Sequence, residues 1–542
     1  MRRETMTETT RNPWAILLVL SLGFFMILLD MTIVYVATPS ILTSLHTSLD
    51  QVLWVFNGYL LAFAVLLITA GRVGDIFGPR QLFAAGLVLF TVASALCGLS
   101  QTDTQLIAAR VLQGVGGAML APQTLTIITS IFPAERRGAA FGIWGAVAGI
   151  STILGPTLGG LIVTNWEWRW IFYMNVPLGV IALIGTFVLI PDLRPGRRHR
   201  LDLVGVALSS VALFAIVYGL IEGQRYDWGT ITGWLTIPMV IGFGIVLLAV
   251  FLVFEQFQAE PLLPLRLFTI RNFSIMNWVA AAMAFGMQGI MLPLIIYTQS
   301  VLGMSPLLSG LTFAPMSVAS MFVAPFAGRL TDRFGGKYFL MGGLTLFGTG
   351  MAVVAALATV HSTWQTFVLP LVVSGVGMGM IFAPMTTTAL RDIQPHQAGA
   401  ASGVLNTTRQ LGAAFGAAGV GAVLQNRLAV SLHDQAVTAS AQLPLAFRSP
   451  FVNGFSNAAK TGFQVGRGQT GGIHLPANVP AQVATQLQYL VHDVFNQGYI
   501  LAMRPTIGVG VAILALAALS CVLVSNKRAV AAEPVAAEAA VA

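Results

Sequence analysis

Long apolar runs restrict the fold of this chain more than any other feature. Runs of about 18 or more largely uncharged residues recur along the whole sequence. As a helix, a run of that length crosses the roughly 30 Å hydrocarbon core of a bilayer. Only helices and closed barrels can span a bilayer, and barrel strands would alternate apolar and polar residues instead of forming continuous runs. The sequence therefore predicts an all-α integral membrane protein.

The charged residues agree with this assignment. Only 9% of the 542 residues are charged and 56% are hydrophobic, whereas soluble proteins carry about 25% charged residues. The net charge of +8 is spread as short clusters between apolar runs, which is the pattern of cytoplasmic loops and not of a nucleic-acid surface. Cys97 and Cys521 fall in different runs, so no disulfide framework or CxxC site is expected.

The hydrophobic pattern predicts fourteen spans, both termini being cytoplasmic. The first run, from about Trp14 to Pro39, is too long for a signal-peptide core and is taken as the first span. The predicted spans cover residues 14–38, 52–71, 81–99, 104–128, 138–163, 170–190, 203–221, 232–253, 274–297, 309–330, 338–359, 364–389, 400–424 and 498–524. Basic residues mark alternate loops as cytoplasmic: Arg80, Arg136, Arg137, Arg194, Arg197, Arg198, Arg200, Arg266, Arg271, Arg333, Lys337 and Arg391.

A ten-residue charged segment occurs twice, as GRVGDIFGPR at 71–80 and as GRLTDRFGGK at 328–337. The first copy lies between predicted spans 2 and 3, and the second between spans 10 and 11. The copies are equivalent if spans 1–6 and 9–14 form two halves and spans 7 and 8 are an inserted pair. A helical bundle built from two repeats, with binding near the midplane, is the architecture of secondary transporters.

These boundaries predict five segments and one long external loop. They are a tail over 1–13, a six-helix half over 14–190, a linker with the inserted pair over 191–260, a second half over 261–524 and a tail over 525–542. The external loop, 425–497, is rich in Gly, Ala, Gln and Asn and shows no clear periodicity. We expect it to be partly disordered, and a small folded cap is the alternative.

The duplicated segment has the form G-x-x-x-D-x-x-G-x-[RK]. This motif resembles the signature of the major facilitator superfamily, in particular of its 14-span drug:proton antiporter branch, and the resemblance extends over nearly the whole chain. The matching residues are Gly71, Asp75, Gly78, Arg80, Gly328, Asp332, Gly335 and Lys337. The glycines permit tight turns and close helix approach, and the aspartates can cap a neighbouring helix N-terminus. We expect the basic residues to pair across the halves, so that the charges latch the cytoplasmic side. The alternative is a solvated loop that only sets topology, and Pro79 replaces a usually basic residue.

Two charged residues fall inside apolar spans, where charge is costly and indicates function. Arg110 lies in LIAARVLQGVGGAM (106–119) and Asp30 in LLDMTIVYVATPS (28–40). Both segments resemble family elements, and the resemblance implies that Asp30 and Arg110 form a proton-coupling pair. Alternatively, Arg110 reaches to the interface, or Asp30 is a packing residue hydrogen-bonded to span 4.

Span 5 contains ILGPTLGG at 153–160, which resembles the antiporter signature, although Ser151 replaces a usual glycine. The residues concerned are Gly142, Gly155, Pro156, Gly159 and Gly160. Proline bends the span, and the glycines offer a smooth face to a helix of the other half. The resemblance implies export and not import.

Further segments resemble the same branch: WRWIFYMNVPLG (168–179), LDLVG (201–205), GMSPLLSG (303–310) and NTTRQLG (406–412). The last contains Arg409, a second arginine in a span, as either a substrate or gating contact or a structural tie. The predicted substrate cavity consists of Phe24, Phe25, Tyr35, Trp54, Asn57, Tyr59, Gln113, Gln288 and Arg409. The aromatic residues are equally compatible with packing or lipid contact.

The resulting prediction is a proton-coupled antiporter, without a cofactor or nucleic-acid partner, that exports amphiphilic drugs, antibiotics and dyes. It would act as a monomer in the plasma membrane of a bacterium. A lipid or lysolipid exporter on the same fold is the alternative. An intramembrane metal or haem enzyme is disfavoured because every histidine lies in a loop or at a span end: His46, His199, His361, His396, His433, His474 and His492. One buried carboxylate against two arginines predicts export of neutral, zwitterionic or monocationic compounds but not of rigid dications.

Overall fold

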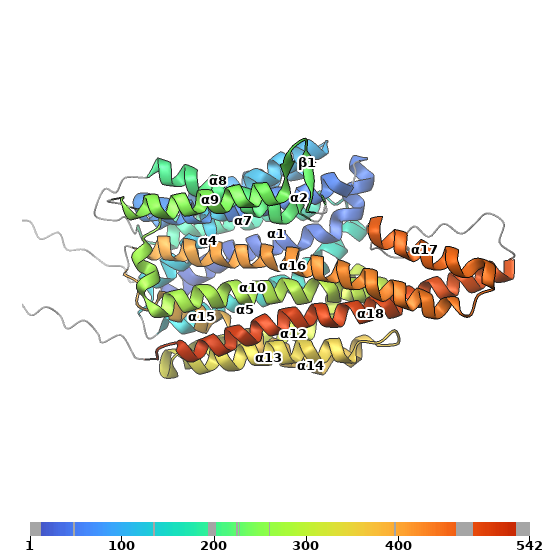
Figure 1. Ribbon diagram of the computed structural model, residues 1–542. Coiled ribbons are helices and arrows are strands. Elements are labelled where there is room, and N and C mark those ends of the chain that lie inside the picture. Colours follow the sequence, from blue (N-terminus) through green and yellow to red (C-terminus); the bar gives the residue numbers. More distant parts are fainter. Residues whose placement is uncertain are drawn as a thin grey trace, which may run out of the picture.

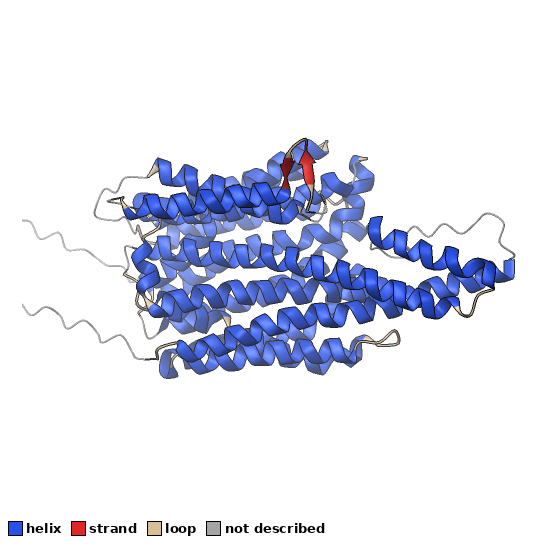
Figure 2. Cartoon of the chain, viewed as in Figure 1, coloured by secondary structure: helices blue, strands red, loops and turns tan. Residues whose placement is uncertain are grey.

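The computed structural model describes residues 12–46, 49–133, 136–192, 202–223, 226, 228–258, 261–394, 397–461 and 481–526. Long helices lie side by side in one bundle (Figure 1). Within the described residues the only strands are β1 and β2, which form a small antiparallel hairpin at one end (Figure 2). Eleven helices of the described part are long and apolar enough to cross a membrane. The expected all-α membrane fold is therefore confirmed.

The helices of the first part of the chain follow the predicted spans. They are α1 (Pro13–Leu45), α2 (Leu49–Phe77), α3 (Pro79–Leu99), α4 (Asp103–Ile131), α5 (Arg137–Asn165), α6 (Trp170–Tyr173) and α7 (Asn175–Leu189). The inserted pair consists of α8 (Leu203–Glu222) and α9 (Ile237–Gln256), with β1 (Thr230–Thr232) and β2 (Leu235–Thr236) between them. Predicted span 6 is thus two helices, α6 and α7, which meet at Met174.

The second part repeats this order. Its elements are η2 (Leu265–Thr269), α10 (Arg271–Ile296), η3 (Tyr297–Val301), α11 (Pro306–Thr312), α12 (Ala314–Phe334), α13 (Lys337–Leu357), α14 (Trp364–Gly379), α15 (Phe382–Leu390), α16 (Ala398–Ser440), α17 (Leu445–Thr461), α18 (Ala481–Ser520) and η5 (Cys521–Leu523). Predicted spans 5, 10 and 13 coincide with α5, α11–α12 and α16, which are helical but are not among the eleven apolar candidates.

Both copies of the duplicated segment form the same turn. Gly78 ends α2 with φ 100° and Gly335 ends α12 with φ 83°, a region that residues with a Cβ avoid. Pro79 then occupies the first position of α3, where its missing N–H costs nothing. The turn therefore depends on the second glycine of the motif, which is Gly78 in one copy and Gly335 in the other.

The two parts of the chain meet through two matching helix pairs, α2 with α16 and α5 with α12. The first glycine of each copy lies at a crossing point. A Cβ on Gly71 would collide with the Gly399 carbonyl oxygen, and a Cβ on Gly328 would collide with that of Gly138. Each half therefore contributes one motif glycine and one helix start to the interface, in a pseudo-two-fold arrangement.

The expectation of partial disorder over 425–497 is wrong for its described residues, which are helical apart from a short turn over 441–444. Helix α16 continues to Ser440, α17 follows, and α18 begins at Ala481; residues 462–480 lie outside the described part. Figure 1 shows α16 and α18 extending beyond the ends of the neighbouring helices, with α17 beside them. The cause is an apolar stripe at helical spacing that is buried between these helices: Leu424, Leu428, Leu432, Ala436, Ala439, Phe451, Phe455, Leu487, Leu490, Val491 and Val494.

Candidate functional site

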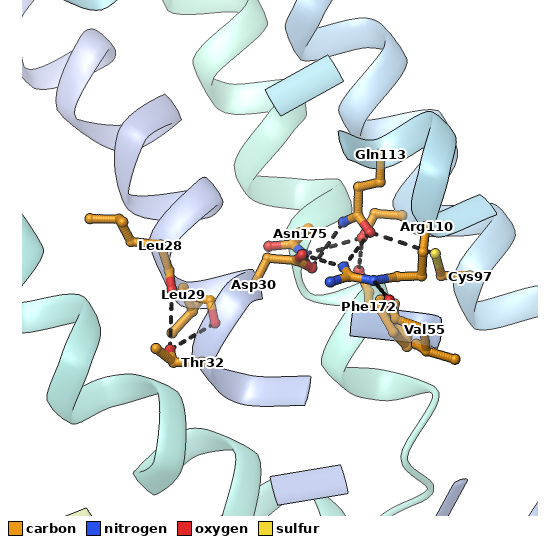
Figure 3. Close-up of polar contacts among 11 residues, drawn as sticks. Leu28, Leu29, Asp30, Thr32, Val55, Cys97, Arg110, Gln113, Phe172 and Asn175 are labelled. Atoms are coloured by element: carbon orange, nitrogen blue, oxygen red, sulfur yellow. Dashed lines mark hydrogen bonds and ion pairs between the residues drawn. The ribbon is translucent and has the colours of Figure 1, made fainter. Parts of the chain in front are cut away.

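Asp30 of α1 is fully buried and accepts hydrogen bonds from three side chains (Figure 3). Its Oδ2 is paired with the guanidinium of Arg110 from α4. Its Oδ1 accepts from Gln113 Nε2 at 2.9 Å and from Asn175 Nδ2 at 3.2 Å. The structure thus brings together the two charged residues that the sequence singles out, and adds two amides that hold the carboxylate.

Arg110 is 1% exposed and does not reach a membrane interface. Its Nε donates to the Val55 carbonyl at 3.0 Å, and the nitrogen that faces Asp30 also donates to Gln113 Oε1 at 2.8 Å. The guanidinium carbon lies 4.3 Å from the centre of the Tyr59 ring, within the range of a cation–π interaction. These contacts compensate the burial of the charge.

Small residues in α4 make this cluster possible. A Cβ on Gly114 would collide with the Tyr59 carbonyl oxygen of α2, and a Cβ on Gly116 would lie 2.6 Å from the Phe90 backbone nitrogen of α3. The glycines that follow Arg110 therefore let α2 and α3 pack closely against opposite sides of α4. This approach places Val55 and Tyr59 beside the arginine.

Three residues of the cluster were not expected from the sequence: Asn175, Ser94 and Cys97. Asn175 Nδ2 also contacts Ser94 Oγ at 3.1 Å, and Ser94 Oγ donates to the Phe172 carbonyl at 2.9 Å. The Cys97 thiol donates to Gln113 Oε1 at 3.6 Å. The sequence feature that could have indicated Asn175 is an amide side chain directly before an apolar run, in WRWIFYMNVPLG.

The predicted cavity residues are distributed over several environments. Tyr59 and Gln113 belong to the Asp30 cluster described above. Trp54 is half-buried, and its ring lies 6.0 Å from that of Tyr218 on helix α8. Phe25 and Asn57 are half-buried and Gln288 is exposed; Phe24 is buried and stacks on Trp144 with ring centres 4.0 Å apart. The side chain of Tyr35 lies outside the described part.

The aspartates of the duplicated segment cap helices of the opposite half. Asp75 accepts from the backbone N–H groups of Gly399 and Ala400, at 3.0 and 2.9 Å. Asp332 accepts from those of Gly138 and Ala139, at 2.8 and 3.2 Å. In each case a carboxylate meets the free N–H groups at a helix start, where negative charge is favoured. The expected capping of neighbouring helices is therefore seen in both copies.

The expectation that the basic residues pair across the halves is wrong. Arg80 donates to the Phe187 carbonyl of α7 at 2.9 Å, and Lys337 donates to the Val522 carbonyl of η5 at 2.6 Å. Each cation therefore binds the C-terminal end of the last helix of its own half, where free carbonyl groups favour positive charge. The carboxylates of the motif thus join the two halves, and its cations bind two helices of the same half to each other.

The glycines of α5 face different neighbours. Gly142 lies against Ala324 and Pro325 of α12, and Gly160 lies near Leu307 of α11, both in the other half. Gly155 instead faces Thr32 of α1, in its own half. The expectation of one glycine face toward the other half is therefore wrong for Gly155, whose approach sets the spacing of α1 and α5.

The remaining antiporter-motif residues leave α5 continuous. Gly159 is buried, and the side chain of Pro156 lies outside the described part. Helix α5 runs from Arg137 to Asn165 without a break.

Arg409 of α16 is half-buried and differs from Arg110 in its partners. It donates to Asn406 Oδ1 at 3.1 Å. Its Nε is buried without a hydrogen-bond partner, and no ion pair involves it in the described part of the chain. Among the described residues no group of three or more His, Cys, Asp or Glu side chains is placed to hold a metal ion.

Sequence comparison relates the chain to bacterial transporters. The family model described as Major Facilitator Superfamily matches residues 20–417. An uncharacterized MFS-type transporter of Mycobacterium tuberculosis is 42% identical over 468 residues, which are 84% of this chain and 80% of that protein. The tetracenomycin C resistance and export protein of Streptomyces glaucescens is 34% identical over 93% of this chain and 91% of its own length. The puromycin resistance protein of Streptomyces alboniger is 35% identical over 80% of this chain and 85% of its own length.

Solved structures show the same fold at low sequence identity. The human organic anion transporter MFSD10 is 14% identical with a TM-score of 0.57, covering 76% of this chain and 93% of its own. A bacterial homologue of the lysosomal transporter Spinster, in an inward-facing conformation, is 16% identical with a TM-score of 0.54 and covers 94% of this chain and 97% of its own. Family model, relatives and fold agree, and the chain belongs to the Major Facilitator Superfamily as a membrane transporter and not an enzyme.

Proposed function

We propose that this protein is a proton-coupled antiporter that exports amphiphilic small molecules across the bacterial plasma membrane by alternating access. The observation that carries the proposal is the buried Asp30–Arg110 pair. Asp30 is buried away from water, and its one cationic partner is the guanidinium of Arg110. When that guanidinium moves away, the buried carboxylate favours its protonated form and can accept a proton. The relatives named for antibiotic resistance and export support the direction of transport.

The geometry divides the roles within the cluster. Arg110 occupies Oδ2 of Asp30, whereas Gln113 and Asn175 both hold Oδ1. Protonation at Oδ2 would therefore release Arg110 while the two amides keep the carboxyl group in place. Because Asp30 belongs to α1 and Arg110 to α4, this release would loosen α1 from α4. Proton uptake is thereby linked to helix movement.

The cytoplasmic latch is the second part of the mechanism. Asp75 and Asp332 of the duplicated segment join the two halves, and we assign their side of the bundle to the cytoplasm. We assign fourteen spans with both termini cytoplasmic, in the two halves 14–190 and 261–524 with the inserted pair between them. The substrate would bind between the halves, and opening of the latch would expose the site to the cytoplasm.

Everted membrane vesicles with an imposed pH gradient test the proposal. The substrate panel contains cationic dyes, neutral antibiotics, acidic amphiphiles and a lysolipid, each measured with the gradient present and collapsed. We expect gradient-driven transport of amphiphiles by the wild type and its loss in Asp30→Asn, which keeps the shape of Asp30 but cannot exchange a proton. Asp103→Asn, at the start of α4, is the control. Normal gradient-driven transport by Asp30→Asn would refute the coupling role, and transport of the lysolipid alone would favour the lipid exporter.

A further inference from the structure

Four glycines define how α16 is oriented in the bundle. Gly399 and Gly403 lie against α2, facing Gly71 and Leu67, and Gly412 and Gly416 lie against α10, facing Ala281 and Phe285. Successive residues of a helix turn by about 100°. Arg409 therefore points about 60° from the direction of Gly412 and about 120° from that of Gly403, between the α10 and α2 faces. Phe415, opposite Asn406 on the helix, is exposed. Arg409 thus leaves α16 toward the space between the halves.

The same contacts give the depth of Arg409. Helix α2 runs antiparallel to α16, since Gly71 lies beside Gly399 and Leu67 lies beside Gly403. Six residues farther along α16, Arg409 is level with about residue 61 of α2, roughly 3 Å along the axis from Tyr59. The guanidinium of Arg110 lies over the ring of Tyr59. The two arginines therefore lie at similar depth in opposite halves.

Neighbouring side chains hold Arg409 without neutralising it. Asn406 Nδ2 donates to the Ser402 carbonyl at 2.9 Å, which directs Asn406 Oδ1 to Arg409. Ser402, Asn406 and Arg409 follow the i, i+4, i+7 spacing of one helix face. The Ser402 hydroxyl is fully buried and has no hydrogen-bond partner, like Arg409 Nε. This helix face thus presents the Ser402 hydroxyl and Arg409 Nε, both without a hydrogen-bond partner, beside the fixed amide of Asn406.

Within the described residues no carboxylate forms an ion pair with Arg409. Asp30 is paired with Arg110, and Asp75 and Asp332 cap helix starts. Glu255 of α9 accepts from the Leu263 N–H, and Glu222 has its own contacts on α8, in the inserted pair outside the two halves. An uncompensated charge within a membrane is costly and marks a functional site by default. Arginine provides a planar fork of donors that fits carboxylates, sulfonates and phosphates.

We propose that Arg409 is the anion-binding residue of the transport site and that acidic amphiphiles are its preferred cargo. This substrate class deepens the proposed function and rests on it. The Asp30–Arg110 pair is neutral overall, so Arg409 leaves the space between the halves with one net positive charge. An apolar molecule with a carboxylate, sulfonate or phosphate supplies the missing partner, whereas a cation would be repelled.

The test uses wild-type protein and variants in liposomes with an imposed pH gradient. The probes are naphthyl, anthryl and pyrenyl derivatives, each as the butanesulfonate, the neutral butanesulfonamide and the butyltrimethylammonium salt. The sulfonate is permanently charged and crosses lipid slowly, so passive flux stays low. The variants are Arg409→Gln, Arg409→Lys and Asp30→Asn. Arg427→Gln is the matched control, because Arg427 is an exposed arginine of the same helix.

The wild type should transport sulfonates faster than the matched trimethylammonium compounds. Arg409→Gln should lower the sulfonate rate about 10- to 100-fold, the loss expected for one charge-assisted hydrogen bond, and leave the sulfonamide rate within about twofold. Arg409→Lys should retain part of the sulfonate transport, and Arg427→Gln all of it. Unchanged sulfonamide transport shows that Arg409→Gln is folded.

Three results would overturn the proposal: equal loss of sulfonate and sulfonamide transport in Arg409→Gln, a wild-type preference for the trimethylammonium compounds, or sulfonamide transport on scaffolds whose sulfonates are neither transported nor bound. Failure of the proposed function looks different. In that case sulfonates would still bind in an Arg409-dependent way by equilibrium dialysis, but the pH gradient would drive no transport in the wild type and Asp30→Asn would behave like it. Gradient-driven transport of sulfonamides alone would retain the function and reject the anion site.

Discussion

Removing the charge of the latch aspartates, Asp75 and Asp332, should open the bundle on the side where they lie. Asp75 and Asp332 each accept two backbone N–H groups from a helix start of the opposite half. Asparagine keeps one acceptor oxygen, so Asp75→Asn loses one charge-assisted hydrogen bond, worth about 1.5–3 kcal/mol. It also loses the interaction of the charge with the helix dipole, worth about 0.3–1 kcal/mol. The total of about 2–4 kcal/mol corresponds to a shift of about 30- to 700-fold toward the open state.

Cysteine labelling measures this shift. Ser402→Cys is a small change at a fully buried position one turn from Gly399, and both native cysteines are buried. A membrane-impermeant thiol reagent is added on the latch side. Its reaction rate should rise in Asp75→Asn and in Asp332→Asn, and further in the double variant. Asp103→Asn is the control, because Asp103 Oδ1 accepts from Thr104 of its own helix. Unchanged labelling in both latch variants would refute the argument that these carboxylates keep the side closed.

Three further predictions concern the Asp30 cluster and α5. Arg110→Lys should lower initial transport rates at least tenfold at matched expression. Arg110 binds Val55 through Nε and binds Asp30 and Gln113 through a terminal nitrogen, and the single nitrogen of lysine cannot occupy both positions. Wild-type rates would return Arg110 to a structural role. Asn175→Ala should change the pH dependence of transport. Asn175→Asp should abolish transport at high pH, because it places a second carboxylate beside that of Asp30. An unchanged pH profile in Asn175→Ala would show that the Asn175 amide only packs. Gly155→Leu should slow transport by pushing α1 from α5 at Thr32, and unchanged kinetics with an unchanged proton leak would make this glycine incidental.

Sequence alone predicts the helices and the paired charges well, for a physical reason. Long apolar runs, and charged residues that are costly inside them, can be recognised in the sequence without a structure. Asp30 and Arg110 therefore stand out, and the structure brings them together. Asn175 does not stand out, because an amide before an apolar run is common and its contact with Asp30 depends on the break between α6 and α7.

The errors concern direction in space. The sequence places Arg80 and Lys337 in loops between helices but contains no information on which half their side chains face. Gly155 and Gly142 are both in α5, yet they contact α1 and α12 because they lie at different positions around the helix. The polar composition of the segment 425–497 hides its buried stripe of Leu428, Leu432 and Ala436. These features follow from tertiary packing and not from local pattern.

The asymmetry between the halves predicts how transport should respond to voltage. Both halves contribute a latch aspartate, but one carries the neutral Asp30–Arg110 pair and the other carries Arg409 with no described counter-charge. If one proton enters for each substrate leaving, export of a monoanion moves two positive charges inward, a neutral molecule one and a monocation none. Each charge gains about 3.5 kcal/mol over roughly 150 mV. In liposomes with a potassium diffusion potential and no pH gradient, the sulfonate gradient at which net flux stops should therefore be the square of that for the sulfonamide. Equal gradients for the two compounds would mean that the anion leaves together with a compensating charge, and Arg409 would then bind a substrate whose charge does no electrical work.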